Sequence, residues 1–334
     1  MTGKTRTICL GIESTAHTFA VSLVDEDGNI LSDVRSTYVP PPGRGIHPRE
    51  SAQHHSQVSP MVLREALAKA KMSLKDVSAV AFSQGPGLGP CLRTGATVAR
   101  ALASYLGVPL VPVHHAIGHI ELAALKTGAR DPLTVLVSGG HTSIVAFSGG
   151  RWRVFGETED ITLGNLLDGF AREAGLPSPG GPTVERFARE GKRFIELPLT
   201  VKGNDVSYSG LLTAAIKKLK EGKYRIEDLC YSLQEVAFSA LVEASERALA
   251  FLEKSELLLT GGVAANRRLQ EMLRIVAKEH NARFLVVPLE YSGDCGAQIA
   301  WTGLLAYKAG VKVSIERSQV KPRWRLDSVP IPWR

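Results

Sequence analysis

The segment TICLGIESTAHTFAVSLVDEDGN, residues 7–29, decides the fold of this chain. It reads as an apolar strand, a short polar loop over 13–18, a second strand and a turn over 25–29. The segment LTVLVSGGHTSIVAFSGG, residues 133–150, repeats this plan with little letter-for-letter identity. A tight polar loop between strands can hold phosphate with its backbone N–H groups. Two such units, one opening each half of the chain, predict a duplicated fold with a ligand between the halves.

Helical and strand patterns alternate through the rest of the chain. A loop rich in Pro and Gly over 40–48 leads into the first long amphipathic stretch. This alternation predicts mixed α/β sheets covered by helices. Together with the duplication, it favours the two-domain ATPase architecture shared by actin, sugar kinases and Hsp70 proteins. Predicted helices cover 50–71, a segment ending at 106, 165–174, 182–190, 210–220, 226–253, 264–279 and 296–308, and predicted strands cover 77–82, 256–259 and 282–287.

Length and composition favour an intracellular globular protein. The 334 residues are enough for two domains with separate cores. No apolar run is long enough to cross a membrane, and residues 1–6 lack the apolar region of a signal peptide. The cysteines show no C-x-x-C spacing and read as reduced core thiols: Cys9, Cys91, Cys230 and Cys295. We therefore expect a cytoplasmic protein with no membrane segment.

The net charge of +7 indicates an anionic partner, because summed positive charge attracts polyanions. Lys and Arg residues gather in two segments, 217–225 and 321–334. The second segment interleaves its cations with Trp324 and Trp333, a pattern that suits nucleic acid and a protein partner equally. The charge alone leaves the class of partner open.

His115 and His119 are spaced so that a helix would present both imidazoles on one face, which is how two ligands are offered to one divalent metal. A pair of surface or hydrogen-bonded histidines is the alternative. The zinc-protease motif H-E-x-x-H needs a glutamate directly after the first histidine, and Ala116 stands there instead. Asp294, in a loop after a predicted strand, is a carboxylate that can complete a His-His-Asp metal site.

Three Gly-Gly pairs mark turns in the second half of the chain: Gly139-Gly140, Gly180-Gly181 and Gly261-Gly262. Glycine lets the backbone approach a ligand closely, and a helix N-terminus favours phosphate. The chain has no G-x-x-x-x-G-K-[ST] motif, and its loop over 85–89 lacks the spacing of a dinucleotide-binding turn. The pairs therefore favour a nucleotide-binding cleft that is neither a P-loop nor a dinucleotide-binding turn.

Polar side chains stand beside these turns. Asp168 and Glu185 can accept hydrogen bonds from ribose hydroxyls, and Asn266 can reach a base or a phosphate. Taken singly, each is more often a surface residue or a helix cap. The residues alone leave both interpretations open.

Taken together, six motifs resemble one known family across nearly the whole chain. That family is the tRNA threonylcarbamoyladenosine synthases, which include bacterial TsaD and the catalytic subunit of the archaeal and eukaryotic KEOPS complex. The helix pattern over 165–173 and the tail through Val320-Lys321 look more like the archaeal branch. The motifs are GIESTAHT (11–18), QGPGL (84–88), HHAIGH (114–119), VSGGHT (137–142), SGL (209–211) and GGVAAN (261–266).

The resemblance implies a two-domain actin-like ATPase fold, duplicated and RNase H-like, and an acyltransferase. The implied reaction moves a threonylcarbamoyl group from threonylcarbamoyl-AMP to N6 of adenosine 37 in ANN-decoding tRNAs. His115, His119 and Asp294 match the family's ligands for one divalent metal, with iron preferred over zinc. The adenylate, or ATP, is expected to contact residues around the Gly-Gly turns: Leu136, Val137, Ser138, Gly139, Gly140, Asp168, Gly181, Glu185 and Asn266.

Two positions depart from the archaeal pattern. Archaeal members usually carry a tyrosine, as a further metal ligand, at the position of Leu136, and an asparagine at that of His141. Because leucine cannot ligate, we expect three protein ligands and open metal positions for water or substrate. His141 is the less favoured replacement, because its side chain begins beyond the glycine turn. No sequence pattern marks a general base for the adenine N6 group, and Glu13 is a weak candidate.

The resemblance also implies partners and a division of the chain. tRNA and KEOPS-type accessory subunits, including a small kinase or ATPase subunit, are the expected partners. We expect an N-terminal subdomain over 1–130 that carries the histidine pair, and a C-terminal subdomain over 131–292 that carries the nucleotide turns. Residues 293–334 would form a closing helix and a basic tail that returns to the first subdomain. Two other functions remain open: an actin-like ATPase or small-molecule kinase acting as a switch, and a non-catalytic nucleic-acid-binding subunit.

Overall fold

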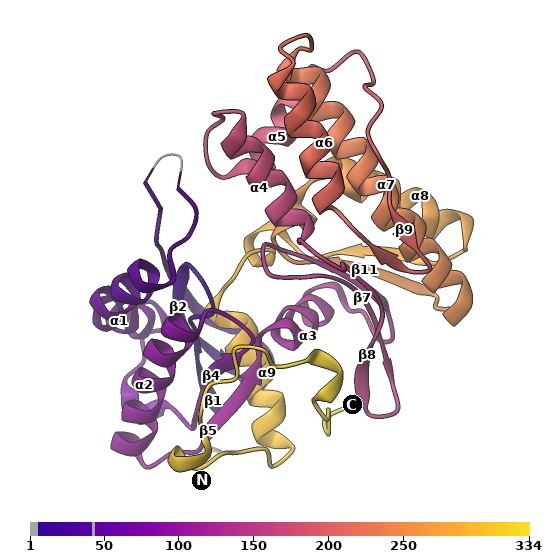
Figure 1. The fold of residues 1–334 in the computed structure, drawn as a ribbon. Helices are drawn as coiled ribbons and strands as arrows, with labels where there is room; N and C mark the ends of the chain where they lie inside the picture. The colour runs from indigo at the N-terminus through magenta and orange to yellow at the C-terminus, as the bar shows by residue number, and fades with distance from the viewer. Residues whose placement is uncertain (1–5, 42–43) are drawn as a thin grey trace.

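The computed structural model describes residues 6–41 and 44–334. Residues 1–5 of the segment judged for a signal peptide, and residues 42–43 of the predicted Pro- and Gly-rich loop, lie outside the described residues. Two five-stranded sheets, each flanked by helices, form the two halves of the described chain (Figure 1). Within the described ranges, no helix is both long and apolar enough to cross a membrane.

The two sheets share one plan, as the two repeated segments predict. The first has the order β3-β2-β1-β4-β5 and the second the matching order β8-β7-β6-β11-β12. In each, three antiparallel strands follow one another, and two later strands add parallel to the first. The strands are β1 (Ile8–Glu13), β2 (Thr18–Asp25), β3 (Ile30–Thr37), β4 (Ala79–Gly85), β5 (Leu110–His114), β6 (Leu133–Val137), β7 (Thr142–Ser148), β8 (Arg151–Glu157), β11 (Glu256–Thr260) and β12 (Arg283–Val286).

Helices cover both sheets. In the first half they are α1 (Pro48–Ala70) and α2 (Gly89–Leu106). In the second half they are α4 (Leu163–Glu173), α5 (Gly180–Ala188), α6 (Ser209–Lys220), α7 (Ile226–Leu252) and α8 (Arg267–Glu279), with a small β9 (Val201–Lys202) and β10 (Asp205–Val206) pair. The predicted helix start at 264 is wrong: 262–265 is a 3₁₀ turn, and α8 begins only after Asn266, whose side chain caps it.

The first sheet is buried on both faces, which explains the continuous apolar run of β1. Alternate residues of a strand point to opposite faces. Ile8, Leu10 and Ile12 lie in the core shared with α1 and α2, whereas Cys9 lies in the core shared with α9 (Gly296–Lys308). The C-terminal helix thus returns to the sheet that opens the chain.

Two glycines allow α9 to approach this sheet closely. A Cβ at Gly11 would lie 2.2 Å from the backbone nitrogen of Ala300 on α9. A Cβ at Gly303 of α9 would lie 2.2 Å from the Cβ of Ala81 on β4. Real carbon atoms do not pack at such distances, so any side chain at either position pushes helix and sheet apart.

Helix α3 (His115–Thr127) lies between the two halves (Figure 1). It follows β5 directly and packs against α9 on one side and against β6 and β11 of the second sheet on the other. Ala116, Ile117 and Ile120 share a buried apolar cluster with Leu136 of β6. This helix therefore joins the cores of both halves.

Residues 319–334, which we call the C-terminal strap, cross from the first half to the second (Figure 1). The backbone N–H of Lys321 donates to the Gln84 carbonyl at the end of β4 (2.7 Å), and the His114 ring binds the Trp324 carbonyl (3.1 Å). Further on, the Ile331 N–H donates to the Gly150 carbonyl in the β7–β8 turn (2.9 Å). The strap therefore ties the two halves together.

Substituting Gly303→Ala tests the close packing of α9. We expect it to destabilise the protein by about 1–3 kcal/mol, because overpacking outweighs the better helix propensity of alanine. Gly210→Ala in α6 is the matched control, since nothing lies within 4 Å of its added Cβ, and we expect it to be neutral or slightly stabilising. Urea unfolding of both variants measures the difference. Equal stability of the two would contradict the packing described.

Candidate metal centre and the glycine-rich turns beside it

Three metal-ligating side chains from distant parts of the chain meet beside α3. His115 is the first residue of this helix, and His119 lies one turn later on the same face. Asp294 lies two residues before α9. Its Oδ1 atom is 3.5 Å from Nε2 of His115 and 3.3 Å from Nε2 of His119. The spacing that the sequence suggested is thus on a helix, and the carboxylate of Asp294 faces both rings.

The donor set fits one divalent cation. The candidate ligand atoms of the three residues all lie within 4.8 Å of one another, and both histidines are buried. Tetrahedral ligands at about 2.1 Å from a metal lie about 3.4 Å from each other, close to the distances here. Two imidazoles and one carboxylate suit zinc or iron and leave coordination positions open. Holding a single ion therefore requires little rearrangement of these side chains.

Glu13, the candidate general base, contacts the centre through His115. Its Oε2 lies 3.0 Å from Nδ1 of His115, and its Oε1 accepts the backbone N–H of Thr15 at 2.6 Å. Gln298 of α9 places its Nε2 3.1 Å from the same Nδ1. A carboxylate on the far nitrogen of a ligating histidine fixes the ring orientation and directs its other nitrogen to the metal. The contacts of Glu13 favour this orienting role.

Burial and the two carboxylates set the protonation of the histidines. Burial lowers the pKa of His115, but the charges of Glu13 and Asp294 outweigh it and raise this pKa to about 9. At His119 burial dominates and lowers the pKa. Burial raises the pKa of Asp294, but the charge of His115 and the hydrogen bond from His119 bring it well below its usual range. A cation that binds Nε2 of His115 must therefore displace a proton.

The Ser138–His141 turn between β6 and β7 lies next to this centre. The His141 ring stacks against that of His115, with centroids 6.1 Å apart. Ser138 Oγ accepts the backbone N–H groups of Gly140 (3.2 Å) and His141 (3.0 Å), which fixes the turn. Gly139 and Gly140 are exposed, and a Cβ added at either position would meet no atom closer than Ser138 Oγ, 4.0 Å from that of Gly140. A ligand can therefore approach this turn within reach of the histidine cluster.

The start of α4 adjoins the same turn, and the start of α5 adjoins α4. A Cβ at Gly164 of α4 would lie 2.7 Å from the Ser138 carbonyl, so α4 begins directly on the turn. Asp168, one helical turn later, accepts the backbone N–H groups of Gly180 (2.9 Å) and Gly181 (3.3 Å) through Oδ1. The predicted nucleotide residues on α4 and α5 are thus in contact with one another, and Asp168 fixes the start of α5.

The other predicted nucleotide residues hold neighbouring segments in place. Glu185 accepts the backbone N–H of Arg267 (3.1 Å). Asn266 is buried: its Oδ1 caps α8, and its Nδ2 donates to Gln234 Oε1 (2.9 Å). Leu136 and Val137 are fully buried, so their side chains offer no surface to a ligand and instead support the turn that follows them.

Sequence reasoning missed two parts of this arrangement. Gln298 lies four residues after Asp294, inside α9, but nothing in the sequence pattern marks it as a neighbour of His115. The stacking of His141 on His115 was likewise not predicted, although the resemblance had singled out His141. The first contact joins residues 183 positions apart, and the second joins residues on either side of β6.

The chain is similar to known proteins over nearly its whole length. The family described as tRNA N6-adenosine threonylcarbamoyltransferase matches residues 29–301. A protein with that name from Caldivirga maquilingensis is 58% identical over 326 residues, which cover 98% of each chain. A "Probable bifunctional tRNA threonylcarbamoyladenosine biosynthesis protein" from Methanothermobacter thermautotrophicus is 53% identical over 326 residues, which cover 98% of this chain and 61% of that protein.

Among solved structures, T. kodakarensis HypF has the same fold as most of this chain. The TM-score is 0.62 at 16% sequence identity, over 91% of this chain and 48% of that one. At this identity the likeness concerns the fold alone.

Replacing Glu13→Gln tests the orienting role of this carboxylate. We expect metal affinity to fall about 10–100-fold, because His115 loses the charged partner on Nδ1. Glu246→Gln is the matched control, since Glu246 contacts His280 (3.1 Å) in a glutamate–histidine pair elsewhere on the protein. Competition with a chelator for Zn²⁺ or Co²⁺ measures both affinities. Unchanged affinity in the Glu13 variant would show that the contact does not support metal binding.

Proposed function

Because the chain belongs to the tRNA N6-adenosine threonylcarbamoyltransferase family, we propose that it transfers the threonylcarbamoyl group of threonylcarbamoyl-AMP to N6 of adenosine 37 in ANN-decoding tRNAs. The family makes the chain a transferase of the acyltransferase type, and its fold is the two-domain actin-like ATPase fold. One observation carries the finer proposal: the His115–His119–Asp294 cluster adjoins the exposed Gly139-Gly140 turn. That arrangement suits a donor with a phosphate at one end and a carbonyl to activate at the other.

The residues that would hold the metal are His115, His119 and Asp294. When bound there, a divalent ion supplies Lewis acidity toward a carbonyl oxygen and an anchor for the donor. Glu13 keeps His115 in the orientation that presents Nε2 to the centre. We propose one metal per chain, iron in preference to zinc, with open positions because Leu136 offers no ligand atom.

The glycine-rich turns would hold the AMP part of the donor. Gly139 and Gly140 allow a phosphate to approach the backbone, because no side chain blocks them. Asp168 lies on α4, which begins on this turn, and Glu185 lies on α5 beside Arg267. The carboxylate oxygens of both would accept from ribose hydroxyls. Asn266 contributes by fixing the neighbouring segment. ATP is a second nucleotide that the same turns would accept.

In the proposed reaction, N6 of the adenine attacks the carbamoyl carbon, the bond from that carbon to the phosphate oxygen breaks, and AMP leaves. Backbone amides of the turn would stabilise the charge that develops on the leaving group, with the N–H groups of Gly140 and His141 exchanging Ser138 Oγ for the phosphate. The attacking nitrogen loses one proton in this step. Glu13 remains the candidate acceptor, although its oxygens are already bound to His115 and Thr15.

We further propose the setting in which this reaction occurs. The acceptor is a tRNA, so the protein would work in the cytoplasm, with KEOPS-type subunits that include a small kinase or ATPase. The name and greater length of the Methanothermobacter relative support an association with a second activity. We propose the subdomains 1–130 and 131–292, with 293–334 returning to the first. The switch-like ATPase or kinase is not favoured, because the family relatives are named as transferases.

The variants His115→Ala and Asp294→Ala test the proposal. We expect each to reduce transfer at least about a hundredfold, because the carbonyl loses its activating centre, while thermal unfolding stays cooperative. His280→Ala, outside the centre, should keep full activity. Each protein is incubated with tRNA, threonine, bicarbonate, ATP and the adenylate-forming enzyme, and the tRNA nucleosides are analysed by mass spectrometry. Full activity of a metal-free variant that carries both His115→Ala and Asp294→Ala would contradict the proposal.

A further inference from the structure

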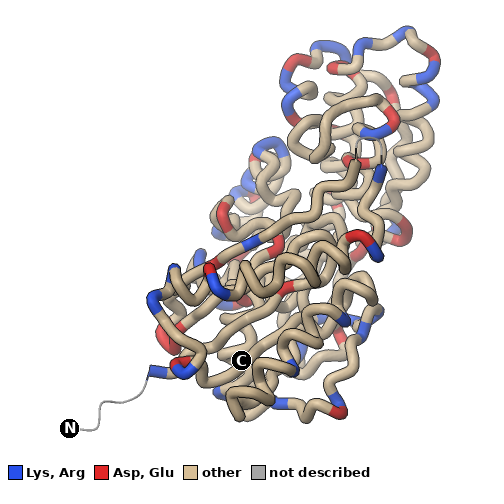
Figure 2. Tube along the Cα trace, turned by 90° about the vertical axis from the view of Figure 1, so that its left-hand side faces the viewer, with Lys and Arg blue, Asp and Glu red and all other residues tan. Residues whose placement is uncertain are grey.

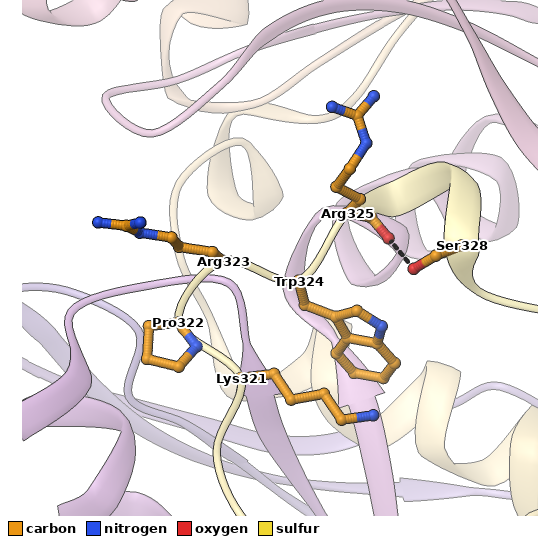
Figure 3. A pocket seen from close by; sticks show the side chains of 6 residues that line it. All are labelled: Lys321, Pro322, Arg323, Trp324, Arg325 and Ser328. Atoms are coloured by element: carbon orange, nitrogen blue, oxygen red, sulfur yellow. Dashed lines mark hydrogen bonds between the residues drawn. The ribbon is translucent and has the colours of Figure 1, made fainter.

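The C-terminal strap contains a hollow that the proposed reaction does not use. It has a volume of about 620 Å³ and is lined by six residues of one short segment: Lys321, Pro322, Arg323, Trp324, Arg325 and Ser328 (Figure 3). Figure 3 shows the guanidinium groups of Arg323 and Arg325 extending away from the strap in different directions. The hollow is shallow and open, so it can contact the outside of a polymer but does not enclose a ligand.

The hollow is set by contacts at the edge of the first sheet where β4 and β5 end. The Trp324 carbonyl binds the His114 ring (3.1 Å), and the Trp324 and His114 rings lie 5.1 Å apart. His114 directly precedes His115, the first ligand of the candidate metal centre. The strap therefore borders the helix start that carries the proposed chemistry.

The cations of this hollow are available to an outside partner. Lys321 and Arg323 are exposed, and the described residues supply neither with an ion pair. Lys321 instead sits over the Trp324 ring, with Nζ 4.4 Å from its centroid, so the indole holds this charge in place. Arg325 is partly neutralised by Asp327 at 3.2 Å and by Glu157 at 4.0 Å. The lining thus presents two unpaired positive charges, on Lys321 and Arg323, and a third on Arg325 that is paired with carboxylates.

A fourth cation stands at the same rim. A Cβ at Gly89 would lie 3.4 Å from Nη1 of Arg93 and 3.6 Å from Cγ of Pro322, so the Arg93 guanidinium is near the strap. Arg93 is exposed. Because both signs of charge are dispersed over the view in Figure 2, the net charge alone does not locate a binding surface. The grouping of Lys321, Arg323 and Arg93 at the strap does locate such a surface.

We propose that this strap hollow is the docking site for the sugar-phosphate backbone of the tRNA, next to the adenosine that is modified. This inference rests on the proposed function. Arg323 and Lys321 would contact phosphates, which positions an RNA without reading its sequence. Because one face of Trp324 is covered by Lys321, the indole acts as a support for that cation rather than as a free stacking platform for a base.

An RNA fits this surface better than a protein. Protein interfaces depend on exposed aromatic or aliphatic anchors at their centre. Of the large hydrophobic residues that are exposed in the described chain, none lies within the strap, and Ile315 is the nearest in sequence. Beside the exposed Pro322 and the half-buried Trp324, the strap offers the cations Lys321 and Arg323, which are the feature that attracts a polyanion.

Charge reversal of Arg323 tests the site. The affinity of the 334-residue protein for an unmodified tRNA transcript is measured over a range of KCl concentrations for wild type, Arg323→Glu and Arg323→Lys. We expect Arg323→Glu to weaken binding about tenfold or more and to reduce the slope of log affinity against log salt by about 1. Arg323→Lys should keep both the tRNA affinity and the salt slope of wild type. Lys217→Glu, an exposed cation on α6 with no ion pair in the described residues, should bind as wild type.

Transfer assays separate this inference from the proposed function. With preformed donor, Arg323→Glu should raise KM for tRNA and leave kcat nearly unchanged at saturating tRNA. If wild type transfers the group but Arg323→Glu binds tRNA as tightly, or if Lys217→Glu loses as much affinity, the docking site is wrong and the function stands. If tRNA binding is unchanged and Arg323→Glu instead loses an accessory protein, the surface is a protein interface and the inference is also overturned. If wild type fails to transfer, yet tRNA binding depends on Arg323, the site stands and the function fails.

Discussion

The close approach of α9 to the first sheet and to α3 is the constraint on which the candidate centre depends. Gly11 and Gly303 let the helix lie against β1 and β4, and a Cβ at Gly118 of α3 would be 3.3 Å from Gln298. With α9 fixed in this way, the segment before it brings Asp294 to both histidines. A metal ligand set that spans most of the chain is thus assembled by backbone packing, and side-chain contacts then refine it.

Helix α3 packs against α9 and also against the second sheet, so it couples the position of α9 to the second half. One face carries the histidine pair, and another shares an apolar cluster with Leu136 and with strap residues such as Leu326 and Ile331. The bidentate pair between Arg334 and Glu121 of α3, at 2.9 Å for each contact, fixes the strap against the same helix. Centre, glycine-rich turn and strap therefore share one helix, so donor and tRNA would meet beside it.

Much of the fold follows from local patterns in the sequence. The two strand–loop–strand units and the alternating helices are periodic, and the predicted elements match the observed ones closely. The sequence pattern predicts a start of α8 that is too early, because the Gly261-Gly262 turn and the cap of Asn266 delay the helix. The histidine pair was visible because its spacing is local. The contact of Glu13 with His115 cannot be predicted from the sequence, because it joins residues 102 positions apart and depends on the sheet register.

The candidate site was predictable only where a motif was local or where the family resemblance named it. Asn266 shows the limit: its place after a Gly-Gly turn suits both a ligand contact and a helix cap, and the structure shows the cap. The strap was recognisable as a basic, aromatic tail. Its path across the ends of β4 and β5 depends on backbone bonds to Gln84 and Gly87, which no periodicity reveals.

The central claim is that one divalent ion is held between α3 and the segment before α9, beside the Gly139-Gly140 turn. Anomalous diffraction from crystals of the metal-loaded protein with a non-hydrolysable donor analogue tests it most directly. The account predicts a single strong peak within bonding distance of Nε2 of His115, Nε2 of His119 and a carboxylate oxygen of Asp294, with the phosphate of the analogue at the glycine turn. A peak at other residues, or an analogue bound away from this turn, would contradict it.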